Sequence, residues 1–151
     1  MKKNFIALLL FCLFGISYAQ NTEKDAVREL IQSAYVEGIH NKAGIDKIKQ
    51  GFHPGFEMIG KHNELLSKFP IYSWIQTVNA SMENQQKQPE DEKITAEYPI
   101  IDITGDAAFA KVDLYHNEKH LFTDYLLLYK FDNEWKIVCK TYYRIPEYQS
   151  S

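Results

Sequence analysis

Three polar side chains of this 151-residue chain are placed where they could carry chemistry on a small organic molecule. His53 stands where a predicted helix ends, and a histidine there can act as a base near neutral pH. Asp124 and Lys111 alternate with apolar residues on predicted strands and would form a polarised acid–base pair in a partly dry cavity. Each also has a purely structural interpretation: His53 bonded to backbone at the helix end, and Asp124 with Lys111 as a structural ion pair. His53 and Asp124 are therefore the candidate catalytic bases.

Aromatic residues supply a second set of candidates. Tyr35, Phe56 and Trp74 could stack on a flat ligand, although aromatic side chains on apolar stripes also build ordinary cores. Lys111, Tyr35 or Tyr143 could stabilise a developing oxyanion. The predicted ligand-binding residues are therefore Tyr35, Phe56, Trp74, Lys111 and Tyr143.

Several other chemistries lack support in the sequence. His116 and His120 flank a tight turn, but no HExxH segment or cysteine pair accompanies them, so no metal site is predicted. There is no glycine-rich phosphate loop and no GxSxG elbow, which leaves nucleotide hydrolysis and serine hydrolase chemistry unsupported. No cofactor is expected.

The first residues have the pattern of a cleavable export signal. Lys2 and Lys3 form a basic start, an apolar run covers 5–16, and 17–19 is a small-x-small cleavage site. We expect residues 1–19 to be a signal peptide, 20–151 to be one domain, and the protein to be exported, periplasmic or secreted. No membrane anchor is expected after cleavage.

Composition narrows the partners of the mature chain. Removing the two leader lysines from 17 basic residues leaves 15 against 20 acidic ones, a formal charge of −5. Nucleic-acid binding usually needs a basic face, so none is expected.

The order of the predicted elements indicates an α+β domain. Apolar residues at helical spacing predict a first helix from Thr22 to about Ile39, a second helix covers 45–52, and a third begins at Pro70. The stretch 56–60 reads as a short strand. The polar segment 83–93 reads as an exposed connector or, alternatively, a lid. From Ile94 onward strand follows strand, with turns at 105–106, 117–118 and 132–133.

Tight hairpins allow the faces of the last strands to be counted. With two-residue turns, Asp124 pairs with Thr141, Leu126 with Cys139, and Lys111 faces Asp124. An apolar floor with one polar corner is then predicted on one face, comprising Phe109, Lys111, Asp113, Phe122, Asp124, Leu126, Leu128, Trp135, Ile137, Cys139, Thr141 and Tyr143. The opposite face is expected to be rich in tyrosine and covered by a partner sheet, with the members Ala108, Ala110, Val112, Leu114, Thr123, Tyr125, Leu127, Tyr129, Val138, Lys140 and Tyr142.

The order of several short motifs resembles the NTF2-like superfamily. They are YVEGIH at 35–40, FHP at 52–54, WI at 74–75, TGDAAFAK at 104–111, TDYL at 123–126 and WKIVCK at 135–140. The chain is most similar to the putative lumazine-binding group, near the SnoaL-like polyketide cyclases. This resemblance implies a cone, in which a curved antiparallel sheet wraps around three N-terminal helices. It also implies an internal pocket and, often, a sheet-to-sheet homodimer.

The sequence leaves three functions open. The first is binding of a small, mainly apolar ligand in an internal cavity. The second is a cofactor-free isomerase, dehydratase or cyclase that uses His53 or Asp124 as base. The third is a non-catalytic interaction module that acts through the outer sheet face. Whether the protein is an enzyme stays open at this stage.

Overall fold

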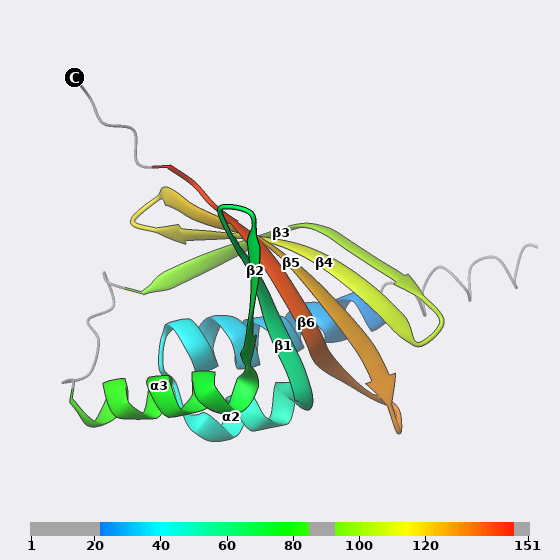
Figure 1. Cartoon of the computed structure of the whole chain (residues 1–151). Helices are drawn as coiled ribbons and strands as arrows, with labels where there is room; N and C mark the ends of the chain where they lie inside the picture. The colour runs from blue at the N-terminus through cyan, green and yellow to red at the C-terminus, as the bar shows by residue number, and fades with distance from the viewer. Residues whose placement is uncertain (1–21, 85–92, 147–151) are drawn as a thin grey trace, which may run out of the picture.

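The computed structural model describes residues 22–84 and 93–146 (Figure 1). The expected signal peptide and nearly all of the expected connector lie outside these residues. The elements follow the predicted order, helices first and strands last, and form an α+β cone with an open, curved sheet. Within the described ranges, no helix combines the length and apolarity needed to cross a membrane.

The first helix changes its winding along its length. Residues 22–30 are α-helical, and Ile31–His40 continue as the π-helix η1. The wider winding is visible at its end, where the Asn41 N–H donates to the Val36 carbonyl five residues back, at 2.9 Å. Long π-helical stretches are rare and often lie at functional sites. The sequence pattern had indicated an ordinary α-helix.

Two shorter helices complete the helical layer. Helix α2 spans Ile45–Gly51, within the predicted range 45–52, and α3 spans Ile71–Glu83 directly after Pro70. Between them lie the strands β1 (Phe52–His62) and β2 (Leu65–Pro70). The sequence indicated only the 56–60 part of this hairpin.

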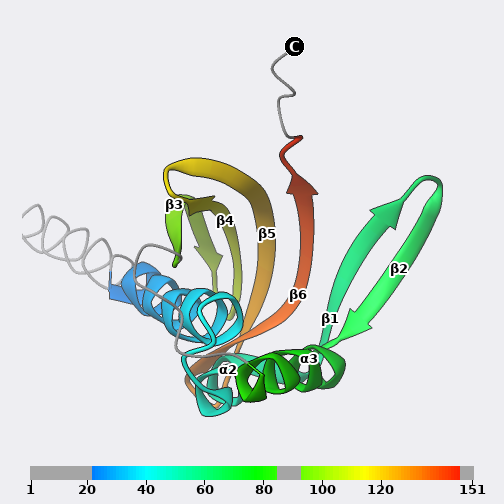
Figure 2. The same ribbon diagram turned by 90° about the vertical axis from the view of Figure 1, so that its left-hand side faces the viewer.

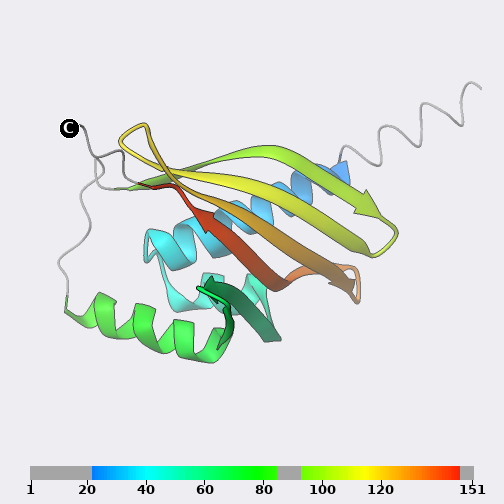
Figure 3. The same cartoon turned by 45° about the horizontal axis from the view of Figure 1, so that its top comes forward.

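The sheet has six strands in the order β2-β1-β6-β5-β4-β3. Strands β3 (Ile94–Thr104), β4 (Ala107–His116), β5 (Lys119–Phe131) and β6 (Glu134–Arg144) form an antiparallel meander. Strand β1 pairs with β6 in parallel, so the sheet is not purely antiparallel. Figures 2 and 3 show the strands curving over the helices, which all lie on the concave side.

Two bulges set which side chains face the helices. One falls near Leu121, so that Val112 rather than Lys111 pairs with Asp124. The other falls at Val138, because Leu128 pairs with Ile137 while Leu127 pairs with Cys139. Each bulge adds one residue to one strand and reverses the alternation beyond it.

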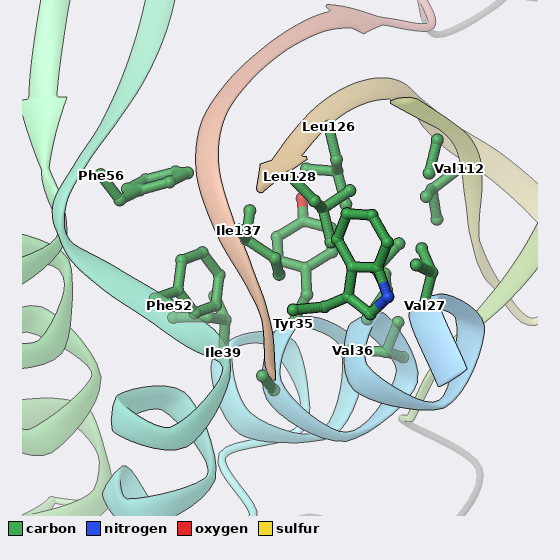
Figure 4. Close-up of a cluster of buried hydrophobic side chains, with 14 of the residues drawn as sticks. Val27, Tyr35, Val36, Ile39, Phe52, Phe56, Val112, Leu126, Leu128 and Ile137 are labelled. Carbon is green, nitrogen blue, oxygen red and sulfur yellow. The ribbon is translucent and has the colours of Figure 1, made fainter. Parts of the chain in front are cut away.

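The concave side of the sheet, called the inner face below, carries the core. Figure 4 shows Tyr35 from η1 converging with Leu126, Leu128 and Ile137 of the sheet. The helices approach closely: a Cβ added at Gly51 would lie 2.1 Å from the Cβ of Ala34. The inner face also carries Ala108, Ala110, Val112, Leu114, Phe122, Asp124, Trp135, Lys140 and Tyr142.

The predicted face assignments were therefore partly wrong. Phe109, Lys111, Asp113, Cys139, Thr141 and Tyr143 lie on the convex outer face, and Ala108, Ala110, Val112, Leu114, Lys140 and Tyr142 lie on the inner face. The assumed hairpins lacked the two extra residues. Lys111 and Asp124 lie on opposite sides of the sheet, so the predicted pair between them does not form.

Candidate active site

A buried lysine occupies the inner face beside the predicted acid. The bulge at Val138 turns Lys140 inward, opposite Leu126, and its side chain is only 6 % exposed. Its Nζ lies 3.3 Å from Oδ1 of Asp124, whose side chain is fully buried. An unpaired charge in such a place would cost several kcal/mol, so each of these groups requires the other.

Tyr35 joins the two charged groups. Its hydroxyl accepts a hydrogen bond from Lys140 Nζ at 2.5 Å and donates one to Oδ2 of Asp124. The tyrosine comes from η1, the acid from β5 and the lysine from β6, so packing of the helix on the sheet assembles the group. Lys140, Tyr35 and Asp124 are called the Lys140 cluster below.

Burial shifts the protonation of every member of this cluster toward the uncharged form. It raises the pKa of Asp124, although Lys140 and the hydrogen bond from Tyr35 oppose the change. It lowers the pKa of Lys140 against the attraction of Asp124. Burial and the neighbouring carboxylate together raise the pKa of Tyr35 well above its usual value. The cluster can thus hold its protons in more than one arrangement.

His40 lies beside the cluster at the end of η1. Its ring meets Tyr35 edge to face at 4.8 Å, and its buried Nε2 has no hydrogen-bond partner among the described residues. Burial, helped by the charge of Lys140, lowers the pKa of His40 to about 3. The ring is therefore neutral at physiological pH and can serve as a hydrogen-bonding group.

A pocket of about 280 Å³ opens above these groups. Lys140 and His40 reach it, whereas Asp124 and Tyr35 lie behind them. Rings surround the lysine: Nζ is 5.3 Å from the centroid of Trp74 and 5.0 Å from that of Tyr142. The remaining lining residues are Met58, Phe122 and Arg144. The pocket is an apolar chamber with cationic nitrogen at its floor and rim.

Residues 22–143 match the family model described as "Putative lumazine-binding". The chain belongs to this family, within the NTF2-like superfamily. Its match covers nearly all of the described residues, including every member of the Lys140 cluster.

Three known proteins show what this chain is similar to. It is 30 % identical over 129 residues to a protein named Aldolase FrzH from Cladobotryum sp, covering 83 % of this chain and 94 % of that protein. An NTF2-like protein of unknown function from Shewanella baltica is 27 % identical, with a TM-score of 0.66 and 83 % and 96 % of the chains covered. An NTF2-like protein of unknown function from Silicibacter pomeroyi, 16 % identical with a TM-score of 0.67 and 83 % and 98 % covered, is similar in fold.

The structure brings together three of the residues singled out from the sequence. Asp124 and Tyr35 belong to the Lys140 cluster, and Trp74 lines the pocket. Phe56 is fully buried and packs against Trp74 at 6.1 Å between ring centroids, so it supports the wall from behind. Whether any of them acts on a ligand stays a prediction.

The other candidates lie elsewhere. Lys111 pairs across the sheet with Tyr125 on the outer face, 3.8 Å from Asp113, and Tyr143 is exposed on the same face. Lys111 and Tyr143 therefore do not face the cavity side of the sheet, where the predicted oxyanion role would require them to lie.

His53 takes part in local structure at the start of β1. Its Nδ1 accepts the Gly55 N–H at 3.0 Å, and its ring stacks on Phe131 at 4.7 Å. It does not line the pocket above Lys140. The contacts of His53 fit its structural interpretation as a histidine bonded to backbone. The assignment of His53 as a catalytic base stays a prediction.

His120, one of the two turn histidines, makes local structural contacts. His120 Nε2 lies 2.9 Å from the Phe122 carbonyl and 3.5 Å from Asp113. Across residues 22–84 and 93–146, no three His, Cys, Asp or Glu side chains gather as a metal site.

Sequence reasoning missed Lys140 and His40. Lys140 was assigned to the outer face, because a bulge at an ordinary valine leaves no compositional mark. His40 is five residues from Tyr35, a spacing that an α-helix places on different sides but a π-helix brings close. The apolar stripe of this helix widens toward its end, where Tyr35, Val36 and Ile39 are all buried. That widening was the available signal of a π-helix.

Proposed function

We propose that this protein binds a small, mainly apolar molecule that presents an oxygen acceptor to Lys140. The observation that carries the proposal is the buried Nζ at the floor of a pocket walled by Trp74, Phe122 and Tyr142. Rings and the Met58 side chain favour a flat apolar body, and a charge-assisted hydrogen bond from the lysine would orient its oxygen. The volume of about 280 Å³ suits a ligand of one or two rings.

Benzoate and benzyl alcohol are suitable probes because both present a phenyl ring and only benzoate is an anion. Titration followed by two-dimensional NMR should move the Trp74 indole signal with both. The double variant Asp124→Asn/Lys140→Met keeps the floor uncharged and should weaken benzoate about tenfold or more, with little effect on benzyl alcohol. Lys61→Met, at an exposed lysine of β1, is the control. Equal benzoate affinity in the wild type and the double variant would contradict the role of Lys140.

A second candidate is a cofactor-free reaction at a carbonyl group. Two observations favour it. One is the chain of hydrogen bonds through Lys140, Tyr35 and Asp124, and the other is the name of the relative from Cladobotryum sp, an aldolase. In this version Asp124 acts through Tyr35 and Lys140, because it does not itself line the pocket. Cleavage of a β-hydroxy ketone probe by the wild type, lost in Lys140→Met, would support turnover, and equal rates would rule it out.

We also propose that two copies pair through the outer face. Ile100, Tyr125, Leu127, Tyr129 and Tyr143 expose between 39 % and 58 % of their surface there. Tyr125, Leu127, Tyr129 and Tyr143 lie on the adjacent strands β5 and β6 and form one patch. Ile100 of β3 faces the same side, with Lys111 of β4 between it and Tyr125, and Asp113 lies close to Lys111. A twofold dimer places the same patch on both partners, which suits a surface that carries both signs of charge.

Export through the leader is part of this proposal. The basic start, apolar run and cleavage pattern at 1–19 support a mature protein that begins at Gln20 and works outside the cytoplasm. N-terminal sequencing of protein recovered from the periplasmic and extracellular fractions would check it, and an intact Met1 in the cytoplasmic fraction would contradict it.

A further inference from the structure

Lys140 differs from the surface lysines in being held where an amine can lose its charge. Lys68 is exposed and paired with Glu57, which raises its pKa, whereas burial lowers that of Lys140. Lys140 also lines a pocket of about 280 Å³, which has room for a small molecule. A nucleophilic amine requires both conditions, a free lone pair and access to a substrate.

We propose that Lys140 forms a reversible covalent imine with a small aldehyde or ketone bound in this pocket. The inference rests on the proposed binding function and assigns both the ligand class and the reactive atom. The favoured ligand is an aromatic or otherwise flat carbonyl compound, because Trp74, Phe122 and Tyr142 form the walls.

Tyr35 provides the route by which the amine becomes neutral. Its hydroxyl accepts from Lys140 and donates to Asp124, so one concerted shift moves a proton from Nζ to the tyrosine and another from the tyrosine to the carboxylate. The products are a neutral amine, an unchanged phenol and a neutral carboxylic acid. No separated charge is left in the buried site, which makes this shift affordable there.

The covalent step then balances. The Nζ lone pair attacks the carbonyl carbon, a C–N bond forms, and an amine proton passes to the carbonyl oxygen to give a carbinolamine. Asp124 returns its proton through Tyr35 to Nζ, a proton on Nζ passes to that hydroxyl, the C–O bond breaks, and water leaves. A protonated imine remains beside the Asp124 carboxylate and reproduces the original ion pair. No oxidant or reductant is required.

His40 is the residue placed to assist the oxygen. It lines the same pocket, and its buried Nε2 has no hydrogen-bond partner among the described residues. A neutral imidazole can hydrogen-bond the carbinolamine hydroxyl without adding charge beside Lys140.

The test uses benzaldehyde with sodium cyanoborohydride, which reduces an imine to a stable benzylamine. The reaction uses protein that begins at Gln20 and is sampled over time. Peptide mapping by mass spectrometry locates each benzyl group. We expect Lys140 to be labelled first and Lys61 to lag far behind. Lys140→Met should lose this early adduct, and Lys61→Met should keep it. Tyr35→Phe should slow labelling of Lys140, because the proton route from Nζ to Asp124 is removed.

Benzyl alcohol, which has the same ring and no carbonyl, separates this inference from the binding proposal. Early labelling of Lys140 in the wild type supports the inference, whatever the stability of the variants. Benzyl alcohol binding without an adduct at Lys140 overturns the imine and leaves the binding function standing. Absence of both binding and labelling overturns both proposals.

Discussion

At the scale of single residues, burying the charges of the Lys140 cluster costs desolvation free energy that an apolar core would not. A buried ion pair seldom adds stability over apolar side chains of similar volume, because desolvation of two charges offsets their attraction. Leu126, opposite Lys140 on the sheet, shows that the inner face accepts ordinary core residues. We infer that the cluster is present because of its position under a pocket rather than because of its contribution to stability.

His40 gives a testable pH dependence. The native state keeps it neutral down to a pKa of about 3, whereas the unfolded chain takes up its proton below about 6.5. Between these values the unfolded state binds more protons, so the contribution of His40 to stability is present above pH 6.5 and is lost as pH falls toward 3, by at most about 1.4 kcal/mol per pH unit. His40→Phe keeps a ring against Tyr35 and should remove this component.

The measurement is urea unfolding at several pH values between 3.5 and 7.5, comparing the wild type with His40→Phe. Taking the difference cancels most of the opposite contribution of Asp124, whose raised pKa stabilises the fold at low pH. His62→Phe, at an exposed histidine, is the control and should run parallel to the wild type. A pH-independent difference between wild type and His40→Phe would refute the buried neutral state.

At the scale of elements, the sequence predicted the helices, the meander and its turns, since each has a local chemical signal. Asp132 and Asn133 adopt the positive φ that their residue types tolerate, and Gly105 does the same in its turn. The two bulges have no such signal, because Leu121 and Val138 are normal strand residues. The bulge at Val138 shifts the strand register by one residue and places Lys140 on the inner face. The candidate site therefore depends on a bulge, which the local sequence does not indicate.

Close approach of elements makes a second prediction. Gly51, at the end of α2, faces Ala34 of η1, and an added Cβ would lie 2.1 Å from the alanine Cβ. Gly51→Ala should therefore separate α2 from η1 and lower the free energy of unfolding by about 1–3 kcal/mol. Because Ala34 precedes Tyr35, benzoate binding should weaken as well. Gly55→Ala, where the nearest atom is 3.2 Å away on the His53 ring, should cost less than about 1 kcal/mol. Urea unfolding compares the two, and equal losses would contradict the close-packing argument.

At the scale of the whole molecule, the sheet separates two surfaces, and we propose a different function for each. Its inner face combines the core, the Lys140 cluster and the pocket, and its outer face presents Tyr125, Leu127 and Tyr129 to solvent. Contiguous exposed apolar side chains on a soluble domain usually mark an interface. The sequence predicted such a face and assigned these three residues and Thr123 to it correctly, although most of its other members changed with the register.

The last prediction concerns pairing of two copies through this outer face. Leu127 lies between Phe109 and Cys139 on the neighbouring strands and is 48 % exposed. In a sheet-to-sheet dimer its side chain would be buried against the partner, so Leu127→Glu should place an unpaired charge in a dry interface and weaken the dimer about tenfold or more. The fold should survive, because the side chain faces away from the core. Leu65→Glu, at an exposed leucine of the β1–β2 hairpin, is the matched control and should leave association unchanged. Sedimentation equilibrium over a concentration series measures the dissociation constants. A wild type that stays monomeric at the highest concentration, or equal weakening by both variants, would remove the outer face as the dimer interface.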